Sequence, residues 1–153
     1  MSEVERIHDQ LRRSYEGTAW SGPSLRKILE GVTAAQAAAS PVASVHSIWE
    51  LVHHIAAWED IARRRIEGER VDTEDIPMEE NFPPVEDTSD AAWEASLAHL
   101  DAVHHRLRDA ITRLTDADLE RRIPGTRYTI YFLLHGVIQH DLYHAGQIAL
   151  LKK

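Results

Sequence analysis

Residues 139–153 read QHDLYHAGQIALLKK, the end of an amphipathic helix that carries two histidines four residues apart. At about 100° and about 1.5 Å per residue, this spacing places His140 and His144 on one face, about 6 Å apart along the helix axis. Two imidazoles in that arrangement can bind one metal ion. Ten histidines among 153 residues make such pairs common by chance, so the direction in which this pair points decides its meaning.

The rest of the chain supplies helices against which this one can pack. The clearest pattern is an apolar series with steps of four and three, as in a bundle helix: Trp93, Leu97, Leu100, His104, Leu107, Ile111 and Leu114. Periodicity and capping residues predict four main helices: residues 2–16, residues 47–67, a helix that starts at 89 and a helix from 129 to the end. Two shorter helical pieces are also expected, one with Pro23 in its first turn and one over residues 33–39. No segment shows the alternation of a strand. We therefore expect an all-α four-helix bundle, with residues 1–153 as a single domain.

The second main helix has a clear start and is followed by a long connection. Ser47 and Glu50 fit a capping box, and Gly68 is a suitable stop. The segment 67–88, EGERVDTEDIPMEENFPPVEDT, is acidic, contains three prolines and has no convincing period. A connection of this length in a compact domain is functional, mobile or needed for a crossover.

Helical phase places the histidine pair on the buried side of the last helix. With Leu133 at 0°, the apolar residues that follow define a buried face between about 0° and about 60°. His140 then lies at about 340° and His144 at about 20°, where leucines would be expected, as the rotation of about 100° per residue gives. His135 lies at about 200° on the same scale, toward solvent.

The helix over 47–67 contains two adjacent histidines, of which one faces inward. When the angles are counted from Leu51, His54 lies at about 300°, on the shoulder of the apolar face, and His53 lies at about 200°, away from it. His54 is therefore the residue of this pair that can reach an interior site.

Other polar residues on these helices have less specific interpretations. Glu59 and Asp141 each lie at about 80°, at the margin of the buried face, and are candidates for hydrogen bonding to metal ligands or for an acid–base role. His104 has no partner at ligand spacing, so we interpret it as a core histidine with its hydrogen bonds met. The remaining histidines are assigned to the surface or to helix caps: His8, His46, His53, His99, His105 and His135.

A metal ion would resolve the cost of burying several imidazoles together. Buried neutral rings lack partners, and protonated rings repel one another. Histidine nitrogen favours zinc, nickel, iron or copper over calcium or magnesium. Three protein ligands leave a position open for water or substrate, as in a catalytic site. Without a metal, the same histidines would form a hydrogen-bonded core.

Composition excludes several other classes of site and partner. Lysine and arginine total 17 against 25 acidic residues, a formal charge of −8, which argues against nucleic acid or an anionic membrane as partner. The absence of cysteine excludes disulfides, thiolate metal sites and a cysteine nucleophile. No apolar run is long enough for a membrane span, and the N-terminus has no apolar signal core, so a cytoplasmic location is expected.

Two motifs in this sequence resemble the DinB/YfiT-like metalloenzyme family. They are SIWELVHHIAAWE at residues 47–59 and QHDLYHAGQI at residues 139–148, with WSGPSL at 20–25 as a weaker likeness. The resemblance implies a four-helix bundle of up-down-down-up topology, whose parallel second and third helices need the 67–88 crossover. It also implies a divalent metal on His54, His140 and His144, zinc or nickel first and iron or manganese next, and a homodimer.

The resemblance also carries expectations about activity. Relatives include transferases or isomerases that use a low-molecular-weight thiol such as bacillithiol or mycothiol, and others described as metal-dependent hydrolases. We therefore expect a metal-dependent enzyme acting on a small molecule, with thiol S-transfer as the leading reaction. The alternatives are a metal-dependent hydrolase and a non-catalytic, metal-stabilised binding or dimerisation module. No catalytic acid or base is identified by the sequence.

Overall fold

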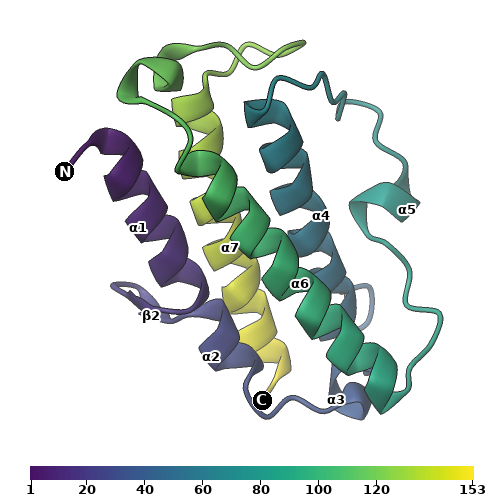
Figure 1. Cartoon of the computed structure of the whole chain (residues 1–153). Coiled ribbons are helices and arrows are strands. Elements are labelled where there is room, and N and C mark those ends of the chain that lie inside the picture. The colour runs from purple at the N-terminus through teal and green to yellow at the C-terminus, as the bar shows by residue number, and fades with distance from the viewer.

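Four long helices lying alongside one another dominate the computed structural model, which describes residues 1–153 (Figure 1). They are α1 (Glu3–Tyr15), α4 (Ile48–Ile66), α6 (Asp90–Ile111) and α7 (Ile130–Leu151). Shorter helical segments are α2 (Leu25–Leu29), α3 (Ala34–Ala38), α5 (Met78–Asn81) and the 3₁₀ helix η1 (Asp116–Glu120). The predicted all-α class is confirmed.

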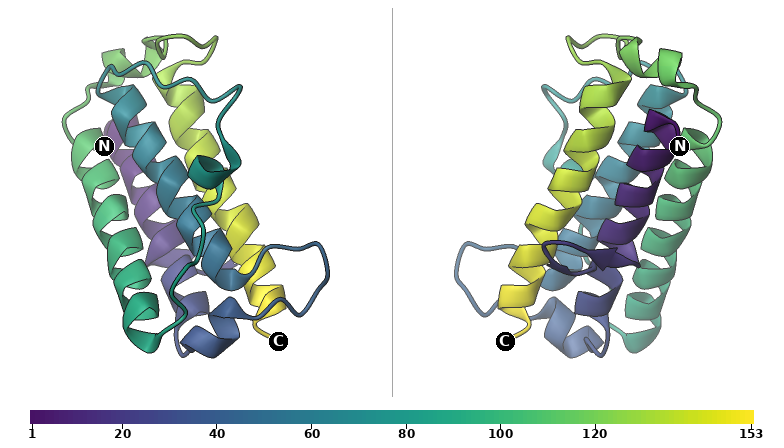
Figure 2. Two further views of the ribbon diagram at one scale, coloured as in Figure 1. Left: turned by 90° about the vertical axis from the view of Figure 1, so that its right-hand side faces the viewer. Right: turned by 90° about the vertical axis from the view of Figure 1, so that its left-hand side faces the viewer.

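The long helices form a ring in which each contacts two neighbours, in the order α1, α6, α4, α7. Along α4 and α6 the chain runs in the same direction, opposite to α1 and α7 (Figure 1). The connection from α4 to α6 therefore has to return along the length of the bundle. It passes over the outside of α4, where α5 makes contact with that helix (Figure 2).

Side-chain caps set the starts of the helices that carry the candidate site. Ser47 Oγ accepts a hydrogen bond from the Glu50 amide at 3.1 Å, and Glu50 Oε2 accepts one from the Ser47 amide at 2.8 Å. The predicted capping box is therefore present at the start of α4. Thr129 caps α7 by accepting from the Phe132 amide at 3.2 Å, at the position where the last helix was predicted to begin.

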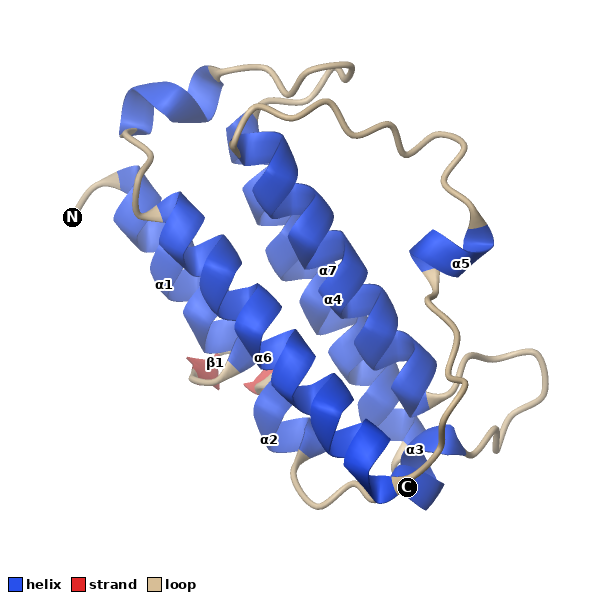
Figure 3. Ribbon diagram, turned by 45° about the vertical axis from the view of Figure 1, so that its right-hand side comes forward, coloured by secondary structure: helices blue, strands red, loops and turns tan.

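The prediction that no strand is present is wrong in one place. Thr18–Ala19 (β1) pairs antiparallel with Gly22–Pro23 (β2) in a small hairpin beside α1 and α2, drawn in red in Figure 3. Pro23, expected in the first turn of a helix, instead lies in β2, and α2 begins at Leu25. Strands of two residues are too short to show a period, and Gly22, at φ 144°, permits a turn that other residues rarely adopt.

The buried core has two apolar parts separated by a polar layer. One part contains the first half of α4 and the ends of α1 and α7, and the other contains the far half of α4 and the start of α7. The polar layer between these two parts consists of three buried side chains, Glu59 of α4, His104 of α6 and Asp141 of α7.

No helix combines the length and the apolar character that crossing a bilayer requires.

Candidate metal centre

Three histidine rings from two helices converge at one point between α4 and α7. The Nε2 atoms of His140 and His54 are 3.0 Å apart, and those of His144 and His140 are 3.1 Å apart. One nitrogen from each ring lies within 4.8 Å of the other two. These are the residues that helical phase selected, so the structure brings the predicted set together.

The outer nitrogens of two of these rings face oxygen acceptors. His54 Nδ1 lies 2.7 Å from the backbone oxygen of Asn81, and His144 Nδ1 lies 2.6 Å from Gln147 Oε1. A carbonyl oxygen can only accept, so the protons are assigned to the Nδ1 atoms. The lone pairs of these Nε2 atoms are then directed at the shared point.

This arrangement fits a transition metal better than it fits a hydrogen-bonded core. A proton on His140 Nε2 could serve only one of the two neighbouring lone pairs, whereas a cation accepts a lone pair from each ring. Two nitrogens on a tetrahedral zinc at roughly 2.05 Å lie roughly 3.3 Å apart, close to the separations of 3.0 and 3.1 Å found here. Burial lowers the pKa of His54 to about 4 and lowers the pKa of His144, so both rings are neutral at pH 7, as ligands must be.

The connection over α4 forms one wall of the site. Phe82 stacks on the ring of His54 with centroids 4.0 Å apart. Asn81 is held in place by Trp58, whose indole Nε1 donates to Asn81 Oδ1 at 2.8 Å. The aperiodic acidic segment gave no signal for these roles, which follow only from the path of the chain.

His53 points away from the three rings, as predicted, but its assignment to the surface is wrong. Its Nδ1 lies 2.8 Å from the backbone oxygen of Pro83, and its Nε2 lies 2.9 Å from Ser96 Oγ. The half-buried ring thus ties the connection to both α4 and α6. Two adjacent histidines of α4 therefore hold consecutive parts of the same connection.

The comparison with known families agrees with this site. The family model of the DinB superfamily matches residues 9–148, a range that contains His54, His140 and His144. The chain belongs to the DinB superfamily. No curated protein and no solved structure matched the chain.

A buried polar layer lies behind the three histidines of this DinB-superfamily protein. His104 Nδ1 donates to Glu59 Oε1 at 2.9 Å, and both side chains are fully buried. The carboxyl groups of Glu59 and Asp141 adjoin each other, and two buried carboxyl groups this close require a proton between them. Burial raises the pKa of Glu59 to about 7, and burial together with the nearby Glu59 raises the pKa of Asp141. Asp141 Oδ1 lies 3.8 Å from His140 Nδ1, so the layer adjoins the three converging histidines.

The helical angles calculated from the sequence placed Glu59 and Asp141 too far from the centre of the buried faces. Glu59 and Asp141, predicted at the margin of the buried faces, are 0% and 1% exposed, whereas Leu133 is only partly buried. The start of α7 is apolar on every side, YFLLH at residues 131–135, so hydrophobicity alone does not fix which side faces the core. The prediction that His140 and His144 face inward was not affected by this error, because both residues lie near the true buried face.

Two other histidine assignments are settled by their contacts. His104 is the core histidine that was predicted, stacked on Tyr15 with ring centroids 3.9 Å apart, although only its Nδ1 has a hydrogen-bond partner. His135 was expected toward solvent but is partly buried, with its ring 4.4 Å from that of Tyr131. Its Nε2 is buried without a partner.

We expect Gln147→Leu to weaken zinc binding about tenfold, because His144 loses the acceptor that fixes its tautomer and ring orientation. Competition with a chromophoric chelator would measure the dissociation constant. Gln139→Leu is the matched control, since Gln139 is exposed on the same helix. Equal affinity in both variants and the wild type would show that Gln147 does not support a ligand.

Proposed function

We propose that this protein is a metal-dependent enzyme that transfers a low-molecular-weight thiol to a small electrophilic substrate. The observation that carries the proposal is the convergence of three imidazole Nε2 atoms, two of which direct lone pairs at the shared point. His54, His140 and His144 would hold the ion, with zinc or nickel as the first candidates and iron or manganese next. The reaction class rests on membership of the DinB superfamily.

The residues around the three histidines hold two of the rings in place and leave one side of the site open. Asn81 and Gln147 hold two of the rings in their ligand orientation. Phe82 covers His54, whereas the His140 side chain is 28% exposed and leaves one side of the site accessible to a small molecule. When bound, a divalent ion would supply the Lewis acid that lowers the pKa of an incoming thiol or water.

Two further expectations belong to the same proposal. The up-down-down-up topology is supported by the shared direction of α4 and α6 in Figure 1. A homodimer is supported by exposed apolar side chains along the outer side of α7, namely Phe132, Tyr143 and Leu150. Size-exclusion chromatography with light scattering would test the dimer, and a monomer at micromolar concentration would contradict it.

Turnover of 1-chloro-2,4-dinitrobenzene with bacillithiol, mycothiol or glutathione tests the reaction directly. The thiol sulfur forms a bond to the ring carbon, chloride leaves and the thiol proton passes to solvent, with a change in absorbance. Metal-loaded wild type should exceed the His140→Ala variant for at least one thiol. Equal rates would overturn thiol transfer.

A parallel assay of ester cleavage with p-nitrophenyl acetate distinguishes a metal-dependent hydrolase from a thiol transferase. The ester would enter from the same accessible side of the site. Ester cleavage above the level of His140→Ala, without thiol transfer, would assign the protein to the hydrolases. Metal binding with neither activity would favour the non-catalytic, metal-stabilised module.

A further inference from the structure

A cavity of about 470 Å³ lies at the end of the bundle where α4 ends and α7 begins. Arg65 and residues 70–74 line it from the side of α4, and residues 125–128 line it from the turn before α7. Figure 1 shows both segments at the end of the bundle opposite the C-terminus. None of the three converging histidines lines this cavity, and Arg65 follows His54 on α4 by a rise of about 16 Å.

Arg65 carries a buried positive charge that no carboxylate of the chain neutralises. The residue is 5% exposed. Its neighbours Arg63 and Arg64 both pair with carboxylates, whereas Arg65 forms no ion pair. Burial lowers the pKa of Arg65, as expected of a cation with too little negative charge around it. An arginine nevertheless stays protonated, so the cost of this buried charge has to be met by an anion.

Hydrogen bonds hold the Arg65 guanidinium in position but leave part of it unused. Nε and Nη2 donate to the backbone oxygen of Val71 at 3.1 and 2.7 Å, and Nη2 also donates to Thr73 Oγ1 at 2.9 Å. Both acceptors are neutral groups, so they supply no negative charge. Nη1 donates to no group of the chain, and its two N–H groups are available to an acceptor in the cavity that Arg65 lines.

Two further arginines line the cavity without a partner of their own. Arg70 and Arg127 are exposed, and neither forms an ion pair or a side-chain hydrogen bond within the chain. The Arg70 side chain packs closely on Gly125, where an added Cβ would lie only 3.1 Å from Arg70 Nε. The turn before α7 therefore leaves room for a second guanidinium at the edge of the cavity.

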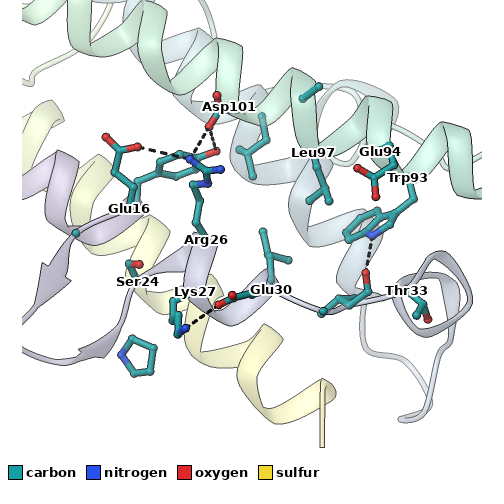
Figure 4. Close-up of a pocket in the computed structure, with 18 of the residues that line it drawn as sticks. Glu16, Ser24, Arg26, Lys27, Glu30, Thr33, Trp93, Glu94, Leu97 and Asp101 are labelled. Atoms are coloured by element: carbon teal, nitrogen blue, oxygen red, sulfur yellow. Dashed lines mark hydrogen bonds and ion pairs between the residues drawn. The ribbon is translucent and has the colours of Figure 1, made fainter.

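The charges of this cavity differ from those of the larger groove between α6 and the segment after α1. In that groove the cations are already paired, as Figure 4 shows: Arg26 with Glu16 and Asp101, and Lys27 with Glu30. The smaller cavity is lined by three arginines and two carboxylates, Asp72 and Glu74, in a chain of net charge −8. Asp72 Oδ1 accepts from the Glu74 amide at 3.1 Å, and neither carboxylate pairs with an arginine. The cavity thus has an excess of unpaired positive charge.

We propose that this cavity binds a phosphate group, either the free anion or one carried by a small organic molecule. A guanidinium presents parallel N–H groups that match two oxygens of a phosphate, and hydrogen bonds between ionised groups are roughly twice as strong as neutral ones. A phosphate dianion supplies the negative charge that Arg65 lacks. Arg70 and Arg127 complete the site from its exposed side, since no other group of the chain engages them.

A nuclear magnetic resonance titration of the full-length protein with inorganic phosphate tests the proposal. The Nε–H signals of Arg65 and Arg70 and the amide signals of Thr73 and Tyr128 should shift with saturation. The same shifts are expected with and without one equivalent of zinc, because no converging histidine lines the cavity. Acetate at equal ionic strength should bind at least about tenfold more weakly, since it carries a single charge.

A second titration with phenyl phosphate distinguishes the two sources of the phosphate group. Tighter binding of phenyl phosphate than of inorganic phosphate would identify an organic phosphate as the ligand. Equal or weaker binding would identify the free anion.

Variants separate recognition in the cavity from general attraction to arginine. The double variant Arg70→Gln/Arg127→Gln should weaken phosphate binding about tenfold, because it removes two charged donors. Arg65→Lys keeps the charge but loses the planar pair of donors, and it should also weaken binding about tenfold. Arg106→Gln is the matched control and should leave binding unchanged, because Arg106 is exposed on α6 and likewise forms no ion pair.

Three outcomes would overturn the phosphate site. They are no saturable shift at millimolar phosphate, equal binding of acetate and phosphate, and equal affinity in the Arg106 variant and the cavity variants. The double variant changes only exposed residues, so its folding is expected to be normal and its result is decisive even if Arg65→Lys is unstable.

Discussion

Replacing His140 with alanine should abolish tight binding of a divalent transition metal. The wild type is expected to bind one zinc or nickel ion per chain, and the dissociation constant of His140→Ala should rise by more than about 100-fold. Loss of a supporting hydrogen bond to a ligand already costs about 10- to 100-fold, so loss of a ligand should cost more. Calorimetric titration of metal-stripped, untagged protein measures both constants.

Thermal unfolding provides a second, independent measurement of metal binding by the His140→Ala variant. At a free metal concentration of about 100 times the dissociation constant, the bound ion should stabilise the wild type by about 2.7 kcal/mol, whereas His140→Ala should gain almost nothing. His105→Ala is the control, because His105 is exposed and far from α7 in the sequence. If His140→Ala and His105→Ala bind metal equally well, the three histidines are not its ligands.

Glu59→Ala should destabilise the fold by about 3 kcal/mol, a loss of about 10 °C in melting temperature. Glu59 is 0% exposed and lies between two buried partners, accepting from His104 at 2.9 Å and adjoining Asp141. Truncation leaves His104 without its acceptor and opens a cavity between the two apolar parts of the core. Urea denaturation monitored by circular dichroism measures the loss.

Glu59→Gln separates the charge of this side chain from its shape, and its stability relative to wild type should depend on pH. Burial raises the pKa of Glu59 from 4.5 to about 7 in the folded protein. Between these values the folded state holds a proton that the unfolded state has lost, so the contribution of Glu59 to stability falls as pH rises. Glutamine does not titrate, so Glu59→Gln should gain on the wild type from pH 4.5 to about pH 7. A difference that stays constant over this range would show that Glu59 is not protonated in the folded state.

Much of the helical framework was predictable because its signals are local. The capping box at Ser47 and Glu50 and the cap at Thr129 satisfy backbone amides within three residues, so the sequence is sufficient to recognise them. The apolar series from Trp93 to Ile111 likewise follows one side of α6, and only its last member, Leu114, lies beyond the end of that helix. The hairpin over residues 18–23 and the short helix α5 were missed because neither is long enough to show a period.

The convergence of the three histidines was also predictable, for a geometric reason. His140 and His144 are one helical turn apart, so any α-helix places their rings together. Choosing His54 over His53 needed only the difference in helical phase between two adjacent residues of α4. The same method failed for Glu59 and Asp141, which were expected at the margins of their buried faces and are fully buried. On α7, the apolar start of the helix obscured which side is most buried.

The sequence by itself determined the class of fold, the family and the three histidines that meet, since these depend on helical periodicity and on motifs within single helices. Only the tertiary structure decided what surrounds those histidines. Asn81 and Phe82 reach His54 because the α4–α6 connection runs back over α4, and Glu59, His104 and Asp141 meet because three helices cross at one level. Contacts between distant segments depend on the packing angles and heights of whole helices, which no local pattern of residues encodes.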